Sequence, residues 1–479
     1  MSEELTNEIK KRRTFAIISH PDAGKTTLTE KFLLYGGAIN TAGSVKGKAN
    51  SKYAVSDWME IEKERGISVT SSVLQFKYDD FCINILDTPG HQDFSEDTYR
   101  TLMAADSAVM VIDASKGVEA QTIKLFKVCV MRHIPIFTFI NKMDREARDS
   151  FELLDDIESV LGIRTCPVNW PIGSGKRFKG IYDRRAKTVR TFESVSTGGA
   201  KSAAETDYDI NDPALKELAT EELYDQLIDE IELLDGASDP LDLEQVQKGE
   251  LSPVFFGSAL TTFGVETFLK YFLEMTTSPL PRMSNEGEID PLTNDFSAFV
   301  FKIQANMNKA HRDRIAFLRI CSGKFQADKE VYHVQSGRKL RLSQPQQIMA
   351  QDRQVISEAY AGDVIGVFDP GLFSIGDTIT MPGSKFEYEG IPTFAPEHFA
   401  RVIQLNSMKR KQFVKGITQI AQEGAIQIFQ EYTAGMSEII VGVVGVLQFD
   451  VLKYRLENEY GCEIRLESLP YGFIRWVGD

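Results

Sequence analysis

The stretch Ser19-His20-Pro21-Asp22-Ala23-Gly24-Lys25-Thr26-Thr27 decides the fold of this 479-residue chain. An apolar run over residues 15–18 precedes it and a helical pattern over residues 28–34 follows it, which predicts a turn from a strand into a helix. Backbone N–H groups at such a turn bind phosphate, Lys25 adds a positive charge, and Thr26 offers a hydroxyl to Mg²⁺. Ser19 replaces the first glycine of the G-x-x-x-x-G-K-[ST] consensus, and an incidental Gly-Lys-Thr turn is the alternative to a phosphate site.

The composition is typical of a globular protein, with 42% hydrophobic residues and a net charge of −15. No apolar run is long enough to cross a bilayer and the start, MSEELTNEIKKRR, has no apolar core, so we expect a cytoplasmic protein without a membrane partner. Five scattered cysteines form no C-x-x-C pair, which argues against a zinc site or a disulfide framework. Residues 193–250 hold 17 Asp and Glu against 3 Lys. Other surfaces are therefore free to be locally basic.

The order of predicted elements indicates three domains. Strands alternate with helices over residues 1–282, as in an open parallel sheet, and residues 167–251 interrupt this alternation as an acidic insertion. We interpret the acidic surface as a solvated face, with protein docking as the alternative. Pro, Asn and acidic residues mark a linker over residues 283–294. Short strands over residues 295–388 predict a small closed β-barrel, and a βαββαβ order over residues 389–479 predicts a split-βαβ, ferredoxin-like domain.

A second motif, Asp87-Thr88-Pro89-Gly90-His91, follows the strand predicted over residues 81–86. Asp87 is placed to hold Mg²⁺ directly or through water, as the acidic residue of a Walker B site does. Gly90 allows its backbone N–H to approach a γ-phosphate, where a side chain would collide. Ser68 comes after a Gly- and Ser-rich, basic segment over residues 36–53 and offers a second hydroxyl to Mg²⁺. We therefore expect this loop to be ordered only while a triphosphate is bound.

A third motif, Asn141-Lys142-Met143-Asp144, selects the base. The Asp144 carboxylate accepts hydrogen bonds from guanine N1–H and the 2-amino group, and adenine has neither. Lys142 is expected to lie along the base and Asn141 to brace the phosphate loop. Ser258-Ala259-Leu260 follows the strand predicted over residues 253–256, which places the Ala259 N–H near guanine O6. The ordered set of motifs, each after a predicted strand, predicts a site for GTP and GDP with Mg²⁺.

Hydrolysis requires a water molecule in line with the γ-phosphate. His91, next to Gly90, is the candidate that orients this water, as a glutamine does in small GTPases. Pro21 and Ile67 are apolar neighbours that we expect to keep His91 away from the water until a partner binds. A histidine without a chemical role is the alternative. No arginine is evidently placed to act as a finger in the same chain, so unaided turnover is expected to be slow.

Several longer segments carry a resemblance to a known family. SHPDAGKTTLTEKFLLYGGAI, SDWMEIEKERGIS, LDTPGHQDFSEDTYR, DASKGVEAQT, NKMDRE, FVFKIQANM, HRDRIAF and VGVLQFDVLKYRL together resemble the bacterial peptide chain release factor 3 family of translational GTPases. The resemblance implies a nucleotide domain, a barrel and a third α/β domain. It also implies a ribosome-stimulated GTPase of termination that promotes the dissociation of class I release factors after the peptide is released. Family members usually continue beyond the final strand, whereas this sequence ends at Asp479.

A ribosomal partner requires local positive charge to meet phosphates. The candidate basic residues are Lys46, Lys48, Lys52, Lys309, Arg312, Arg314, Arg338, Lys339, Arg341, Lys409, Arg410, Lys411 and Lys415. A solvated face is the alternative for any single cluster, and a monomer is the default state. Two other functions stay open: a translational GTPase resembling elongation factor G, or a guanine-nucleotide-sensing module with negligible hydrolysis. Asp144 disfavours an ATPase.

Overall fold

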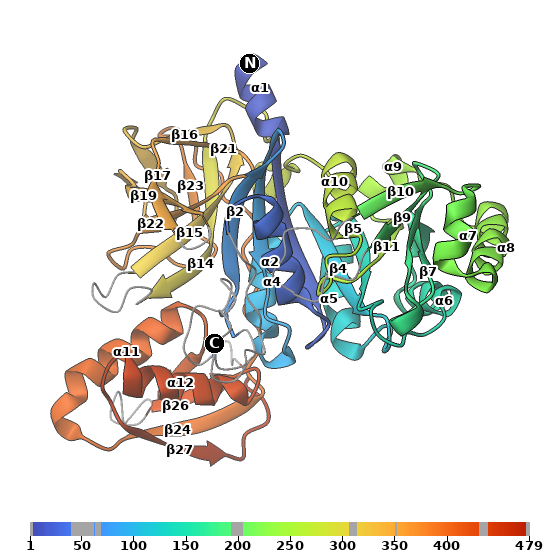
Figure 1. The fold of residues 1–479 in the computed structure, drawn as a ribbon. Coiled ribbons are helices and arrows are strands. Elements are labelled where there is room, and N and C mark those ends of the chain that lie inside the picture. Colours follow the sequence, from blue (N-terminus) through green and yellow to red (C-terminus); the bar gives the residue numbers. More distant parts are fainter. Residues whose placement is uncertain are drawn as a thin grey trace.

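The N-terminal part of the chain is built on a seven-stranded sheet (Figure 1). The computed structural model describes residues 3–39, 62, 69–192, 205–305, 314–349, 352–430 and 439–475. The strand order is β2-β3-β1-β4-β5-β11-β6, in which β2 runs antiparallel to β3 and the other neighbours are parallel. These strands are β1 (Arg12–Ser19), β2 (Ser72–Tyr78), β3 (Phe81–Asp87), β4 (Ser107–Asp113), β5 (Ile136–Asn141), β6 (Arg164–Pro167) and β11 (Leu251–Phe256). The predicted α/β class is confirmed.

Helices lie on both faces of this sheet, so its central strands are buried on two sides. Along β1, Phe15 and Ile17 pack into one hydrophobic cluster, while Ala16 and Ile18 pack into another. Successive side chains of a strand point to opposite faces, which is why the strand is apolar throughout rather than alternating. The helices of this part are α1 (Glu3–Lys10), α2 (Lys25–Tyr35), α4 (Ser95–Met103), α5 (Ala120–Met131), α6 (Ser150–Leu161) and α10 (Val265–Met275), with a 3₁₀ turn, η1, at Gln92–Phe94.

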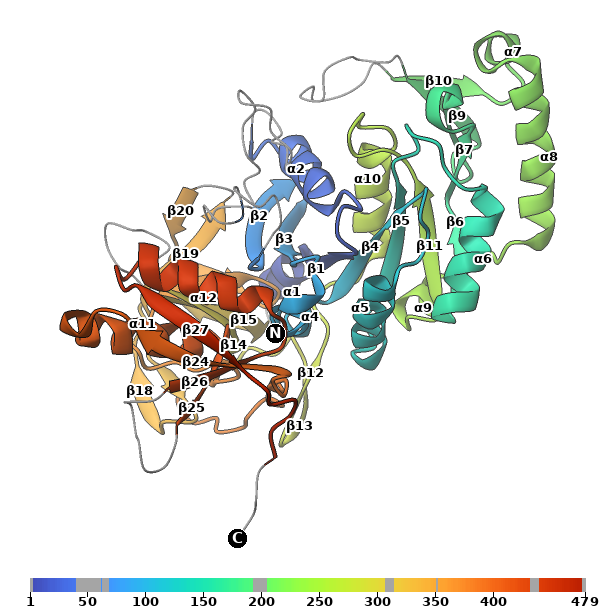
Figure 2. The same cartoon turned by 90° about the horizontal axis from the view of Figure 1, so that it is seen from below.

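Between β6 and β11 the described residues form a separate antiparallel sheet and three α-helices. The sheet contains β7 (Asn169–Ile172), β8 (Gly180–Asp183), β9 (Thr188–Phe192) and β10 (Glu205–Asp209), and the helices are α7 (Pro213–Ala219), α8 (Glu221–Ala237) and α9 (Leu243–Gln247). Trp170 is fully buried, and its Nε1 donates to Glu230 Oε2 at 2.6 Å, which attaches α8 to this sheet. Figure 2 shows the insertion on the side of the molecule opposite to the C-terminal domain.

The next part of the chain is an eight-stranded antiparallel sheet that curls into a barrel-like domain (Figure 1). Its strands are β14 (Ser297–Ala305), β15 (Arg314–Ser322), β17 (Val331–His333), β18 (Arg338–Leu340), β19 (Ser343–Met349), β20 (Asp352–Val355), β22 (Val364–Phe368) and β23 (Thr378–Thr380), with a separate pair, β16 (Lys324–Gln326) and β21 (Glu358–Tyr360). A hairpin of β12 (Arg282–Ser284) and β13 (Gly287–Ile289) lies where the sequence predicted only a linker.

The C-terminal domain has the predicted split-βαβ topology. Its sheet order is β25-β26-β24-β27, with β24 (His398–Gln404), β25 (Gln427–Gln430), β26 (Ile439–Val443) and β27 (Ile464–Leu469). Helices α11 (Arg410–Gln422) and α12 (Leu447–Asn458) connect the strands, and their apolar side chains pack together in one cluster. No helix within the described ranges is long and apolar enough to cross a membrane.

Charged side chains of the barrel are buried against the nucleotide domain. Lys302 of β14 donates to the backbone oxygen of Ser71, and burial lowers the pKa of Lys302. Arg319 of β15 donates to Ala104 O at 2.9 Å and pairs with Asp106. Hydrogen bonds to charged groups that are removed from water depend strongly on geometry. These contacts therefore fix how the barrel sits on the nucleotide domain.

Candidate nucleotide site

The loop between β1 and α2 has the backbone conformation of a phosphate-binding loop. Asp22 and Gly24 both adopt positive φ, at +64° and +98°, and α2 begins at the next residue, Lys25. Two independent reasons require glycine at position 24. Its φ is unfavourable for other residues, and a Cβ there would lie 2.2 Å from Asn141 Nδ2. A loop of this conformation that leads directly into a helix N-terminus is a place where backbone N–H groups can bind an anion.

Lys25 and Asp87 meet at the carboxyl edge of the sheet. Lys25 Nζ lies 2.5 Å from Asp87 Oδ1, and both side chains are almost completely buried. Thr29 Oγ1 also approaches Asp87 Oδ1, at 3.4 Å. The neighbouring Thr26 is 8% exposed at the start of α2. A hydroxyl and a carboxylate beside a phosphate loop are oxygen ligands of the kind that Mg²⁺ prefers, so the described residues fit that ion.

The segment after β3 packs against the phosphate-binding loop. Thr88 Oγ1 donates to Ile17 O at 2.8 Å, which ties the segment to β1. A Cβ on Gly90 would lie 3.5 Å from Pro21 Cα, an ordinary contact distance. Packing within the chain therefore does not require glycine here, and the close approach of the Gly90 N–H to a γ-phosphate stays a prediction. His91 is one third exposed, and its Nδ1 accepts from Asp93 N at 3.2 Å.

Asn141 joins the base-selecting motif to two other loops. Its Nδ2 donates to Ala23 O at 2.8 Å, so its predicted role in bracing the phosphate loop agrees with the structure. Its Oδ1 accepts from the Ala259 N–H at 2.8 Å. That N–H was predicted to meet guanine O6, and it would have to share its hydrogen bond between Asn141 and the base.

Groups of other loops hold the remaining members of the motif in place. Lys142 Nζ lies 2.5 Å from Asp22 O and 2.6 Å from Asp113 Oδ2. Burial alone would raise the pKa of Asp113, but hydrogen bonds from Lys142 and Ser115 hold it below its usual value. Asp113 was not identified from the sequence, although its place at the end of β4 was a usable signal. An ionised Asp113 keeps the long Lys142 side chain in one position.

Ser258 orients the carboxylate that is predicted to select guanine. Ser258 Oγ donates to Asp144 Oδ1 at 2.5 Å, and Ser258 itself is fully buried. Met143, in contrast, is 1% exposed and belongs to the hydrophobic core, and its backbone N–H donates to Gly257 O at 3.1 Å. Leu260 is 49% exposed beside them. The structure thus brings together the loops after β1, β3, β5 and β11.

The side chain of His20, another predicted site residue, binds groups of its own chain. It is 1% exposed, and its Nδ1 contacts Pro21 O at 2.7 Å and the Glu119 carboxylate at the start of α5. Both partners are acceptors, so Nδ1 carries the proton. Desolvation lowers the pKa of His20, although Glu119 opposes the shift. The imidazole therefore links the phosphate-binding loop to the start of α5. Glu119 was missed because it is distant in the sequence.

Some predicted residues lie outside the described residues or have other partners. Outside them are Ile67, Ser68, Lys46, Lys48, Lys52, Lys309 and Arg312. Arg314, proposed as a surface cation, is 6% exposed and pairs with Asp369 at 2.7 Å, so that interpretation was wrong.

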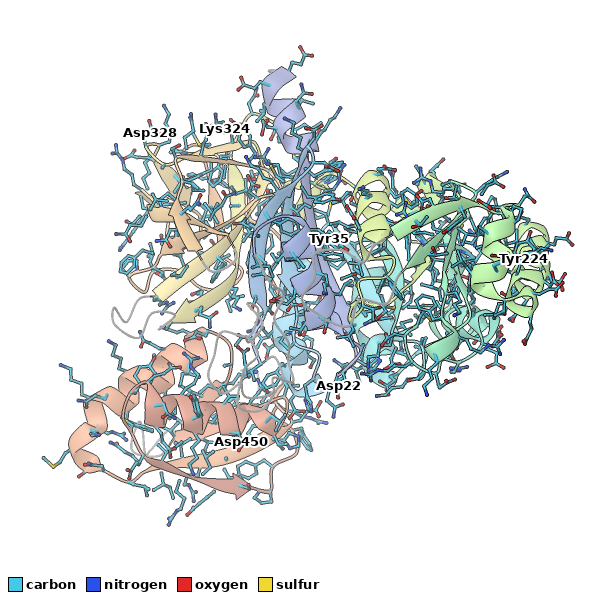
Figure 3. All side chains as sticks on the ribbon, viewed as in Figure 1. Asp22, Tyr35, Tyr224, Lys324, Asp328 and Asp450 are labelled. Carbon is cyan, nitrogen blue, oxygen red and sulfur yellow. The ribbon has the colours of Figure 1, made fainter. Side chains whose placement is uncertain are left out.

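Figure 3 labels Asp22 of the phosphate loop at the edge of the nucleotide domain that faces α12, the helix that carries Asp450.

Comparisons with known families match this geometry. The elongation factor Tu GTP-binding domain matches residues 10–278, elongation factor G domain 2 matches residues 295–381, and the class II release factor RF3 C-terminal domain matches residues 388–479. A crystal structure of a Thermus thermophilus protein superposes with a TM-score of 0.76 at 22% identity, covering 96% of this chain and 67% of that one. At that identity the likeness supports the fold alone.

Curated proteins found by sequence share a much higher identity with this chain. Peptide chain release factor 3 of Symbiobacterium thermophilum is 60% identical over 475 residues, which cover 99% of this chain and 90% of the relative. The proteins of the same name from Gloeobacter violaceus and a Cyanothece species are 57% and 55% identical, over 99% and 100% of this chain and 89% and 88% of theirs. This chain therefore belongs to the peptide chain release factor 3 family, the translational GTPases that act in termination.

Proposed function

We propose that the ribosome stimulates GTP hydrolysis by this chain and that the chain promotes the dissociation of class I release factors after peptide release. The family membership supports the role in termination. The observation that carries the assignment of a guanine-nucleotide site is the 2.8 Å bond from Asn141 to Ala23 O, because it couples the base-selecting motif to the phosphate-binding loop. One ligand that spans both loops is a guanine nucleotide.

Each loop has a separate task in binding GTP. The backbone of residues 19–24 and the Lys25 ammonium bind the phosphates, and Asp144, held by Ser258, accepts from the guanine N1–H and 2-amino groups. Lys142 lies along the base, anchored by Asp113. Because these hydrogen bonds involve charged groups in partly buried positions, each should contribute about 1.5–3 kcal/mol to binding.

Thr26, Asp87 and Ser68 are the residues that we assign to Mg²⁺. The ion would neutralise charge on the β- and γ-phosphates of the bound nucleotide. The chain's own part is to present a hydroxyl at the start of α2 and a carboxylate at the end of β3.

His91 is assigned to orienting the attacking water, and Pro21 and Ile67 to restricting its approach. Nδ1 of His91 is occupied as an acceptor, so the neutral ring carries its proton on Nε2. Nε2 is then the nitrogen left to hydrogen-bond water beside the Gly90 N–H. General acid–base and positioning groups of this kind contribute about 10²–10⁴-fold to a rate.

Exposed basic residues of the barrel and the C-terminal domain are the proposed contacts with ribosomal RNA. They are Arg338, Lys339, Arg341, Lys409, Lys411 and Lys415. Such contacts are independent of sequence and sensitive to salt, so stimulation by ribosomes should weaken as the salt concentration rises. We further propose a cytoplasmic monomer.

GTP turnover with and without vacant ribosomes tests the hydrolytic assignment. The native chain should be slow alone and fast with ribosomes, and His91→Ala should lose at least about 100-fold of the stimulated rate. His398→Ala, an exposed histidine at the start of β24, is the matched control and should behave as the native chain does. Equal rates for the native chain and His91→Ala would contradict the role of His91.

A second assay follows a labelled class I release factor on termination complexes. With this chain and GTP the factor should leave faster than without them. If it leaves no faster while GTP is hydrolysed, the proposed role in recycling is wrong even though the GTPase activity stands.

A further inference from the structure

Asp93 lies in η1, two residues after His91, and it binds groups on two domains, one through its carboxylate and one through its backbone N–H. Asp93 Oδ2 accepts from Leu447 N, the first backbone N–H of α12, at 2.8 Å. Asp93 Oδ1 lies 3.4 Å from His91 Nδ1, and the Asp93 N–H donates to the same nitrogen at 3.2 Å. The residue that holds the His91 ring therefore also holds the C-terminal domain.

The N-terminus of α12 has no capping side chain from its own N-cap residue, and Asp93 binds there instead. Val446, the residue that precedes the helix, does not cap it with its side chain. The first backbone N–H groups of a helix have no partner within the helix and bind an acidic side chain well. Asp93, which is 354 residues away in the sequence, takes the place of a capping residue.

Gly445 allows the close approach of the two domains. A Cβ on Gly445 would lie 2.3 Å from Asp93 Cβ and 2.4 Å from Asp93 Cα, distances at which real atoms do not pack. The Gly445 backbone does not adopt a positive φ, so close packing alone requires glycine here. The backbone of η1 thus rests directly on the start of α12.

Apolar contacts surround the same point. Phe94 of η1 packs with Val69 and with Val451 of α12 in one buried cluster, against which Leu447 also packs. Beside it lies a cavity of about 50 Å³ where the three domains meet, lined by Phe94, Val69, Ile303 and Val451 among others. A rearrangement of the C-terminal domain would therefore move η1, and with it His91.

We propose that Asp93 is a positioning residue that couples the docking of the C-terminal domain to the orientation of His91. The inference rests on the proposed function, in which His91 orients the attacking water. When α12 is seated, Leu447 N–H fixes the Asp93 carboxylate and Asp93 N–H fixes Nδ1 of His91, which leaves Nε2 for the attacking water. When α12 is displaced, Asp93 loses its bond to Leu447 N–H and no longer holds η1 in place, so the His91 ring is free to turn.

Two variants break the contact from opposite sides. Asp93→Ala removes the carboxylate, and Gly445→Ala introduces a methyl group that pushes α12 away. Each should lower the ribosome-stimulated kcat about five- to tenfold, the size expected when one orienting hydrogen bond is lost. The Kd for GDP should stay within about twofold, because neither residue touches the base or the phosphates.

Two matched variants serve as controls. Asp93→Asn keeps an oxygen that accepts from Leu447 N–H, and asparagine caps helices about as well as aspartate, so it should retain most of the rate. Gly390→Ala adds a methyl group where nothing lies within 4 Å, so it should leave kcat unchanged. Thermal unfolding of each variant shows whether it folds. If Gly445→Ala does not fold, the Asp93 variants alone test the coupling.

The double variant with His91→Ala separates positioning from a general structural role. Asp93→Ala should cost nothing further in the His91→Ala background, because it acts through that ring. If it costs the same factor in both backgrounds, or if Asp93→Ala turns over as the native chain does while His91→Ala is slow, the coupling is refuted. If His91→Ala itself is as fast as the native chain, the proposed role of His91 fails, whatever Asp93 does.

Discussion

Replacing Arg455 with methionine should destabilise the C-terminal domain by about 3–5 kcal/mol, the cost of removing one partner from a buried ion pair. Arg455 is 2% exposed in α12. Its guanidinium lies 2.8 and 3.1 Å from the two carboxylate oxygens of Glu423, and Nε and Nη2 each lie 3.0 Å from an oxygen of Glu459. Methionine keeps the unbranched aliphatic stem, so the loss comes from two buried carboxylates left facing each other without a cation.

The size of this effect should depend on pH. Burial raises the pKa of the Glu423 carboxyl, and Arg455 opposes that shift, so Arg455→Met raises the pKa further. A carboxyl whose folded pKa lies above its unfolded value contributes stability that is fully present below the unfolded pKa and is lost as pH rises through the folded pKa. The deficit of the variant should therefore be largest near about pH 7.5 and shrink toward about pH 4.5, where glutamate ordinarily takes up its proton.

Urea unfolding of the full chain at several pH values measures the deficit. Arg465→Met is the matched control, because Arg465 makes a 2.9 Å ion pair with Glu467 that is largely exposed. Exposed pairs contribute about 0–1 kcal/mol, so the control should change little. A deficit for Arg455→Met no larger than that of the control, or one that grows toward acidic pH, would refute the reasoning.

Three other substitutions test the nucleotide site through the affinity for fluorescent GDP. Asp144→Asn should weaken binding roughly 10- to 100-fold, because it removes a charged acceptor from the guanine N1–H and 2-amino groups; unchanged affinity would mean that the base lies elsewhere. Gly24→Ala should weaken binding at least as much, since its φ of +98° costs another residue about 1–3 kcal/mol and its Cβ would collide with Asn141, while the circular dichroism spectrum should not change. Asp113→Asn should cost about fivefold, because Lys142 loses an ion pair of about 1 kcal/mol but keeps its bond to the phosphate loop; a loss as large as that of Asp144→Asn would contradict a supporting role.

Much of the nucleotide domain was predictable because its signals are local. A strand, a turn and a helix N-terminus occur within about ten residues of Lys25, and the spacing of such a motif depends only on neighbouring backbone geometry. The same is true of Asn141 and Asp144, which follow an apolar strand directly. Ala259 was placed at the correct edge of the sheet, yet its hydrogen bond to Asn141 depends on how β5 and β11 pair, and no local pattern gives that register.

The sequence by itself determined the fold class, the order of the three domains and the loops that gather at one edge of the sheet, because periodicity and turn residues act over short stretches of chain. Only the tertiary structure decided the partners of the ionisable groups: His20 with Glu119, Lys142 with Asp113, Arg314 with Asp369, and Asp93 with the first N–H of α12. A charge or a helix N–H that leaves water must find a partner within about 3 Å. Which group supplies that partner depends on tertiary packing, which brings together residues far apart in the sequence, 354 positions apart for Asp93 and Leu447.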